Sequence, residues 1–238
     1  LELNASLELV HAADGADGTL FTSDLPGFSS ALYKDSDSNG TVDQVVLTFD
    51  ENVSIGGTVA STRFTWTSAS GANGFAGSLS GNASASGTDV TITIDSAEAN
   101  ETGHTTTPTI AYSDNSDDGT NKIQDTDGNI VQTFSAQNVS DGAKPVVISK
   151  KYQDVDVNGT VERVLLTLSE DAATQTAVIG DFVYAANDIT GSALLGGTLA
   201  YPASNEVGFV LGTAGNANIT GHTTAPTIAY TDGGATAV

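Results

Sequence analysis

Short alternating runs of apolar and polar residues dominate the chain, and Gly, Asn, Asp and Ser residues separate these runs. In the run 44–49, Val45, Leu47 and Phe49 would share one face of an extended segment, and the other residues would share the opposite face. The run 89–94 alternates in the same way. No segment sustains the apolar period of an amphipathic helix. The pattern therefore predicts an all-β sandwich built from short strands.

We expect a strand wherever turn residues bound the alternation. In the first half of the chain, the expected strands are residues 28–33, 42–49, 63–67, 75–79, 89–94, 109–112 and 130–135. In the second half, they are residues 146–152, 161–168, 182–186, 193–200, 206–211 and 227–230.

Two phrases occur twice, in the same order and at nearly the same spacing. Residues 99–112 read ANETGHTTTPTIAY, and residues 217–230 read ANITGHTTAPTIAY, 118 residues later. Residues 33–43, YKDSDSNGTVD, return as residues 152–162, YQDVDVNGTVE, at an offset of 119. Such repetition indicates one domain type used twice. The predicted organisation is an N-terminal extension, 1–26, and two sandwich domains, 27–138 and 139–238.

The second domain lacks a counterpart of the strand expected at 130–135, because only TDGGATAV follows Tyr230. At the other end of the chain, LELNASLELV alternates and predicts a strand. Its apolar face would hold Leu1, Leu3, Ala5, Leu7 and Leu9. Proteins normally cover an open sheet edge. We expect this strand of one copy to enter the second domain of the next copy, a head-to-tail contact that generates a filament.

Two other arrangements stay open. Residues 1–10 could add an edge strand to their own first domain, while residues 233–238 serve as a short seventh strand of the second domain. Alternatively, the chain is a piece of a longer tandem array of the same domain.

Acidic residues far outnumber basic ones, with 29 Asp and Glu against 7 Lys and Arg and a net charge of −22. This charge argues against nucleic acid and anionic membranes as partners. It leaves two interpretations, a surface kept soluble by repulsion or carboxylates neutralised by bound cations. The chain has no Cys and no apolar run long enough to cross a bilayer. It starts at Leu1 and has no Met, so we expect that a leader or initiator is removed, which fits an extracellular or cell-surface location.

The phrase D-x-D-x-N-G-T-x-[DE] places oxygen-bearing side chains at alternate positions around a glycine turn. This spacing matches the first part of a calcium loop, with ligands at positions 1, 3, 5, 7 and 9. The expected ligands are Asp35, Asp37, Asn39, Thr41 and Asp43 in the first repeat, and Asp154, Asp156, Asn158, Thr160 and Glu162 in the second. A metal-free hairpin turn is the alternative, because the same residues favour tight turns. We expect calcium here to stiffen the junction between the domains.

The remaining acidic residues and histidines are weaker candidates for chemistry. Weaker candidates for calcium ligands, for which solvated loop acids are the favoured interpretation, are Asp14, Asp17, Asp114, Asp117, Asp118, Asp125 and Asp127. Asp50–Glu51 and Glu170–Asp171 are also expected to be solvated or cation-linked, because adjacent residues of a strand point apart. His104 and His222 are interpreted as repeated turn residues, since the only further histidine is His11. No nucleophile, phosphate or zinc motif is present, so we expect no enzymatic activity.

Residues 35–49 and 154–168 share the phrase D-x-D-x-N-G-T-V-[DE]-x-V-x-L-T-[FL], which resembles bacterial Ig-like repeats of surface-layer proteins and large secreted adhesins. Residues 125–134, DTDGNIVQTF, are similar to the terminal strand motif of those domains. The resemblance covers most of both repeats. It implies two Ig-like sandwiches with a calcium-stabilised structural role at the cell surface, and it carries the ligand role to the Asp and Asn positions named above.

The predicted function is that of a non-enzymatic extracellular structural protein. It would bind Ca²⁺ and assemble with copies of itself, head to tail, into a filament or surface layer. The alternative is a fragment of a calcium-stiffened adhesin stalk whose binding tip lies outside this chain. An accessory module of a secreted hydrolase would need exposed aromatic platforms, and an aromatic content of 6% gives that class little support.

Overall fold

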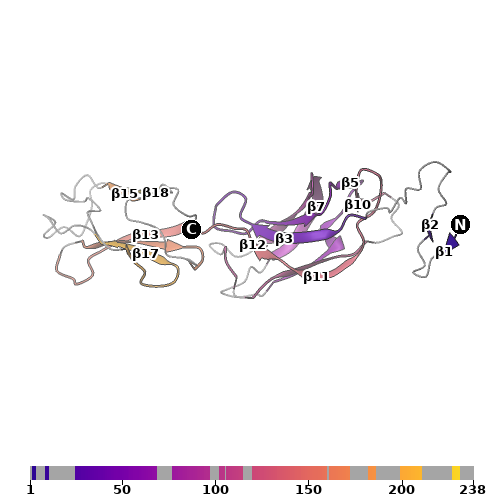
Figure 1. The fold of residues 1–238 in the computed structure, drawn as a ribbon. Coiled ribbons are helices and arrows are strands. Elements are labelled where there is room, and N and C mark those ends of the chain that lie inside the picture. Colours follow the sequence, from indigo (N-terminus) through magenta and orange to yellow (C-terminus); the bar gives the residue numbers. More distant parts are fainter. Residues whose placement is uncertain are drawn as a thin grey trace.

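The computed structural model describes residues 2–3, 9–10, 25–68, 77–96, 102–104, 106–114, 120–159, 161–171, 182–185, 199–210 and 227–230. Within these ranges the regular structure is β-strand, apart from one 3-10 turn, η1, at Ser61–Arg63. The predicted all-β sandwich fold is confirmed. None of the described residues belongs to a helix long and apolar enough to span a membrane. The sheets of the two repeats lie end to end (Figure 1).

Two facing sheets make up the first repeat. The larger sheet has the order β12 (Ser140–Asp141), β3 (Phe28–Lys34), β4 (Gln44–Phe49), β8 (Asp89–Ser96) and β7 (Gly77–Ser86). The smaller sheet has the order β11 (Phe134–Asn138), β9 (Thr109–Tyr112) and β6 (Phe64–Thr67), and β5 (Ser54–Gly56) pairs with β10 (Lys122–Gln124) beside them.

The core of the first repeat lies between these sheets. Leu47 and Tyr33 enter it from the larger sheet, and Ile110 and Tyr112 enter it from the smaller one, all almost fully buried. These residues occupy alternate positions of their strands, so the period-two pattern places them on the inner face. Burial of each large apolar side chain contributes about 1.5–3 kcal/mol to folding.

The segment that contains β11 and β12 closes the first sandwich. β11 pairs with β9 in the smaller sheet, and β12 runs parallel to β3 in the larger sheet. The ring of Phe134 lies 4.9 Å from that of Phe28 and 5.8 Å from that of Tyr112, measured between centroids. Val131 and Val139 complete the core. One segment therefore covers both sheets.

The second repeat reproduces this strand order. Its larger sheet runs β13 (Val147–Gln153), β14 (Arg163–Leu168), β17 (Glu206–Val210) and β16 (Leu199–Ala200), the counterparts of β3, β4, β8 and β7. Its smaller sheet pairs β15 (Phe182–Ala185) with β18 (Thr227–Tyr230), the counterparts of β6 and β9. Phe209 and Leu166 are buried between them, in a smaller core than that of the first repeat.

The described part of the second repeat holds no counterpart of β11 or β12. There, β13 has only β14 as a neighbour, and β18 has only β15. Val147 is 45% exposed and Tyr152 is 37% exposed, whereas Tyr33, at the position equivalent to Tyr152, is 0% exposed. The larger sheet of the second repeat therefore keeps apolar side chains in contact with solvent.

Most expected strands are present, with shifted ends. The expected strand at 130–135 is displaced to β11, and Ile130 makes only an isolated bridge to Gln124. Ile130 pairs across the turn at 125–129 with Gln124, and pairing with β9 begins only at Phe134. β5, β10 and β12 are short strands that the pattern did not predict. Val139 is buried in the first core and β12 pairs with β3, so contacts with the first sandwich continue as far as Asp141.

The N-terminal segment does not form the single strand predicted for residues 1–10. β1 (Glu2–Leu3) pairs antiparallel with β2 (Leu9–Val10), so the chain reverses between them. A lone strand leaves its backbone groups without partners, and self-pairing satisfies part of them. These two strands form a sheet of their own and pair with no other described strand. Leu1, Ala5, Leu7 and residues 233–238 lie outside the described residues.

Candidate metal centre

Each predicted calcium loop joins the first two strands of the larger sheet in its repeat, β3 to β4 and β13 to β14. The two loops share one backbone conformation. Ser38 and Gly40 adopt positive φ angles of 58° and 90°, and Val157 and Gly159 adopt 60° and 88° at the equivalent positions. Glycine takes such angles at no steric cost, which explains its place in both phrases.

The first Asp of each loop organises the turn. The Asp35 carboxylate accepts hydrogen bonds from the backbone N–H groups of Asn39, at 3.1 Å, and Gly40, at 2.8 Å. Asp154 accepts the equivalent bonds at 3.0 and 2.8 Å. In each loop the Asn side chain also donates to the second Asp, at 2.8 Å. This repeated network curls each loop so that its acidic side chains converge.

The convergence produces two carboxylate clusters. Asp35, Asp37 and Asp43 each bring one oxygen to within 4.8 Å of the others, and Asp154, Asp156 and Glu162 do the same. Among the residues that the structure describes, no Lys or Arg forms an ion pair with either cluster. Three carboxylates at this separation repel one another unless a cation or protons neutralise them.

Glu162 adds a second observation. Its Oε2 accepts a hydrogen bond from the Val155 backbone N–H at 2.7 Å, which fixes the side chain over the loop. Its Oε1 is buried and accepts no hydrogen bond from the residues that the structure describes. A buried carboxylate oxygen without a donor is costly, and a divalent cation would satisfy it. The donor set, hard oxygens without sulfur or imidazole, fits Ca²⁺ or Mg²⁺.

The two expected threonine ligands do not belong to the carboxylate clusters. Thr41 lies in the first loop, partly buried, and Thr160 lies outside the described residues. Asp43 accepts a backbone hydrogen bond from Ser36 at 3.0 Å, the counterpart of the bond between Val155 and Glu162. The structure therefore brings together three of the five expected ligands in each loop as a carboxylate cluster.

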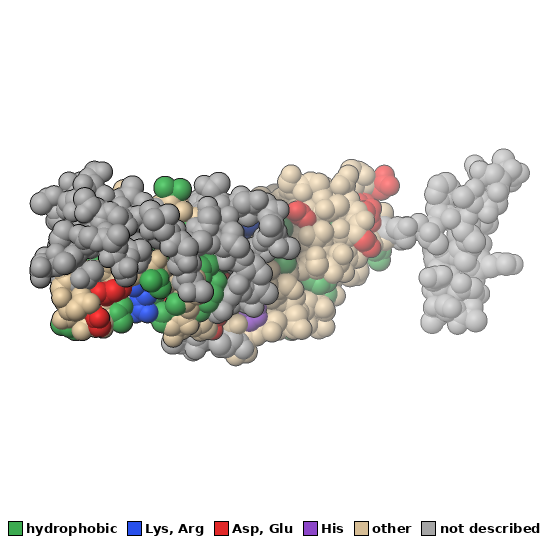
Figure 2. Space-filling model, turned by 60° about the vertical axis from the view of Figure 1, so that its left-hand side comes forward, with side chains coloured by type: hydrophobic (Ala, Val, Ile, Leu, Met, Phe, Trp, Pro, Cys, Tyr) green, Lys and Arg blue, Asp and Glu red, His purple; other side chains and the backbone are tan. Residues whose placement is uncertain are grey.

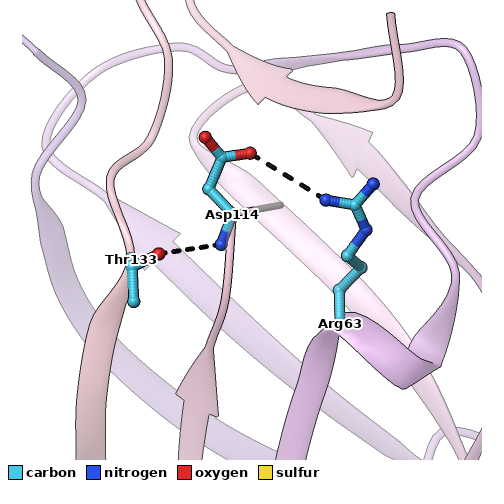
Figure 3. Close-up of polar contacts among 3 residues, drawn as sticks. All are labelled: Arg63, Asp114 and Thr133. Carbon is cyan, nitrogen blue, oxygen red and sulfur yellow. Dashed lines mark hydrogen bonds and ion pairs between the residues drawn. The ribbon is translucent and has the colours of Figure 1, made fainter. Parts of the chain in front are cut away.

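The weaker acidic candidates act as structural residues where the structure describes them. Asp114 lies 4.0 Å from Arg63, and its backbone N–H donates to the Thr133 hydroxyl at 2.9 Å (Figure 3). Asp127 donates its backbone N–H to Asp125. The positions outside the described residues are Asp14, Asp17, Asp117 and Asp118.

Asp125 is a turn residue whose carboxylate is satisfied by the chain itself. It is buried, and it accepts hydrogen bonds from the backbone N–H of Asp127 and from both the backbone and the side chain of Asn129. Burial raises the pKa of this carboxyl, but these hydrogen bonds outweigh burial and hold the pKa below its usual value. Asp125 therefore needs no metal ion.

The remaining polar residues lie apart from the metal loops. Asp50 accepts a hydrogen bond from the Gly27 backbone N–H at 2.7 Å and so fixes the start of β3. His104 lies 2.7 Å from the Tyr33 hydroxyl, a structural contact, and His11 and His222 lie outside the described residues. Glu170 contacts the first repeat, an arrangement that the sequence reasoning missed because the partners are 68 residues apart.

Models of known protein families, curated proteins and solved structures were compared with the chain, and none of the three comparisons finds a match.

Proposed function

We propose that this chain is an extracellular structural protein that assembles with copies of itself by strand complementation and binds calcium in two loops. The observation that carries the proposal is that the described part of the second sandwich has no counterpart of β11 or β12. Strands β13 and β18 each have one neighbour among the described residues, whereas β3 and β9 each have two. An incoming strand would supply what β11 supplies in the first repeat.

The gain from such a strand can be judged from the first repeat. There, Phe134 of β11 stacks on Phe28. At the position equivalent to Phe28 stands Val147, and its neighbour Ile148 is also exposed. A strand added at β18 would cover Val147, as Phe134 covers Phe28 in the first repeat, whereas Ile148 would stay exposed like its counterpart Ser29. Each apolar side chain fully buried by the partner would contribute about 1.5–3 kcal/mol.

The proposed occupant is the N-terminal segment of a second copy. Its apolar residues alternate as an inserted strand requires. Charge favours the same pairing, because β13 exposes Lys150 and Lys151, whereas residues 1–33 contain acidic residues and no Lys or Arg. Figure 2 shows basic side chains beside hydrophobic ones on one face of the molecule. The pairing of β1 with β2 covers two residues per strand and must open, a small cost because isolated hairpins are marginal.

This contact joins different surfaces of two identical copies. A head-to-tail contact that does not close on itself generates a filament or an extended layer. Calcium in the loops would neutralise part of the negative charge and stiffen the connection between β3 and β4 and between β13 and β14. Both roles suit a load-bearing protein outside the cell.

The test is to delete residues 1–12 and measure the mass of the purified protein by light scattering, with electron microscopy of the same sample. We expect the full chain to form polymers and the deletion variant to remain monomeric. A matched control, Asn4→Gln with Ser6→Thr, keeps the apolar face and both acidic residues and should still assemble. Polymers formed by the deletion variant would refute exchange of this strand.

The alternative function is a segment of a calcium-stiffened adhesin stalk. The end-to-end sandwiches in Figure 1 favour it, because tandem repeats build extended stalks. In that case the strand missing from the second repeat would come from chain that follows it. A full-length chain that stays monomeric at every concentration, with and without calcium, would support this alternative over self-assembly.

A further inference from the structure

The two repeats meet through a chain of hydrogen bonds between hydroxyl groups. The Thr102 hydroxyl lies 2.6 Å from that of Ser169 and donates to Glu170 Oε1 at 2.9 Å. The Ser169 hydroxyl in turn accepts the Val146 backbone N–H at 2.9 Å. If Thr102 donates to Glu170, Ser169 must donate to Thr102, because each hydroxyl has one proton. Thr102 belongs to the first repeat and the other residues to the second, so this chain crosses the junction.

The contact is close as well as polar. A Cβ added at Gly103 would lie 2.9 Å from both Cβ and Oε2 of Glu170, so only glycine fits without a shift. Thr102 and Ser169 are buried. The next residue, His104, lies 2.7 Å from the Tyr33 hydroxyl and packs edge-on against its ring. Segment 102–104 is thereby held to both repeats.

Acidic groups surround Glu170. Among the described residues, the titratable groups that face it are Asp141 on β12, Asp171 beside it in the chain, and Tyr33 with its partner His104. Burial raises the pKa of Glu170 to about 7, the Thr102 hydrogen bond lowers it, and the negative charges of Asp141 and Asp171 raise it. Burial, with Asp141, also raises the pKa of the Tyr33 hydroxyl, which stays neutral.

We propose that Thr102–Gly103 of the first repeat and Ser169–Glu170 of the second form an acid-stabilised clasp, which fixes the angle between the repeats and loosens as the solution becomes neutral to alkaline. The clasp does not depend on self-assembly or on calcium. It is a conformational device of the single chain.

The direction of the pH effect follows from the pH range in which Glu170 is charged in the closed and in the open state. With the repeats apart, Glu170 would titrate near 4.5, and with the clasp closed it titrates near 7. Below pH 4.5 the carboxyl is protonated in both states, so the clasp keeps its full stability. As the pH rises through 7, the closed state must hold a second carboxylate beside Asp141. Because Glu170 is only half-buried, solvent screens this penalty, and we expect the closed fraction relative to the open fraction to fall about tenfold between pH 5 and 8.

The experiment places fluorescent labels on the full chain, which has no native Cys. Thr65→Cys on β6 and Val183→Cys on β15 are exposed positions in equivalent strands of the two repeats. Single-molecule energy transfer, recorded in EDTA from pH 4.5 to 8.5, reports the distance between the repeats. Circular dichroism on the same samples checks that both repeats stay folded. We expect one narrow distance at pH 5 and a broad distribution at pH 8.

Substitutions identify the titrating group. Glu170→Gln keeps the Thr102 contact without a charge, so the repeats should stay clasped at every pH. Glu51→Gln, at the equivalent position of the first repeat, should leave the transition unchanged. Asp141→Asn removes the charge that opposes ionised Glu170, so the clasp should stay closed to higher pH. Thr102→Val removes the hydroxyl that contacts Ser169 and Glu170, so the clasp should open at lower pH. A distribution that does not change with pH in the unsubstituted chain, or a transition that persists in Glu170→Gln, would overturn the clasp.

Discussion

Among the expected ligands, the two metal loops differ in residue type only at Glu162, where the first repeat has Asp43. Glu162 Oε1 is buried and has no hydrogen-bond donor among the described residues. We expect Glu162→Gln to weaken calcium binding at the second loop at least tenfold, through loss of one ligand charge. Calorimetry should then find one intact site and one weakened site.

Without calcium, Glu162→Gln should stabilise the fold, although it weakens calcium binding. Gln removes one of three converging negative charges, so the melting temperature in EDTA should rise while the stabilisation by calcium becomes smaller. Asp43→Asn provides the matched change in the first loop. Equal calcium binding by the unsubstituted chain and both variants would show that the loops are metal-free turns.

The sequence predicts the residues of a site only where these residues lie close together in the chain and a turn sets their relative positions. In D-x-D-x-N-G the glycine turn and the alternate spacing bring Asp35 and Asp37 together within a few residues, and the structure places them in one cluster. Asp125 lies in a similar phrase, but there Asn129 saturates its oxygens. The partners of Glu170 come from a distant segment, so no spacing rule could have found them.

The clearest difference between the strands of the two repeats is the pairing of β11 with β9, which has no counterpart in the described part of the second repeat. Phe134 of β11 packs against Phe28 and Tyr112 in the first sandwich. We expect Phe134→Ala to destabilise the first repeat by roughly 2–4 kcal/mol, near the lower part of the range for buried aromatics because Phe134 is only partly buried. Denaturant unfolding, followed by the fluorescence of Trp66 in the first repeat, measures this loss.

The control is Val147→Ala in the second repeat, at the position equivalent to Phe28. Val147 is exposed in the single copy, so its truncation should cost less than about 1 kcal/mol there. In assembled material the same change should weaken the polymer, because a partner strand would cover Val147. A large loss of stability in the monomer would mean that the second sandwich is already closed.

Strand prediction succeeded where alternation is long and failed where tertiary contacts decide. β4 and β8 alternate over six residues or more, and the apolar pattern predicted both. β12 has two residues and no apolar alternation, and it exists because the edge of β3 is free to accept it. β1 and β2 pair with each other and with no other described strand, a pairing that the alternation of apolar residues did not predict.

For the whole molecule, the repeat offset identifies a second segment that could close a sandwich. At 119 residues, Leu20 corresponds to Val139, and Pro26 corresponds to Pro145. Val139 is buried in the first core, so Leu20 has the residue type and the position of a closing segment. If copies exchange a strand as proposed, residues 12–23 are a second candidate for the donor beside residues 1–10.

A peptide experiment separates these donors. A synthetic peptide of residues 125–143 carries the segment that closes the first repeat, and it should enter the open second repeat and stop assembly, since the receiving strands share their order with β3 and β9. Peptides of residues 1–10 and 12–23, added separately to the full chain, should differ in potency, and the stronger inhibitor identifies the natural donor. The control is the 125–143 peptide with Phe134→Asp and Val139→Asp, which cannot fill the core. Light scattering follows the loss of polymer. Assembly that none of the three native peptides slows, at concentrations far above that of the protein, would mean that copies join through another surface.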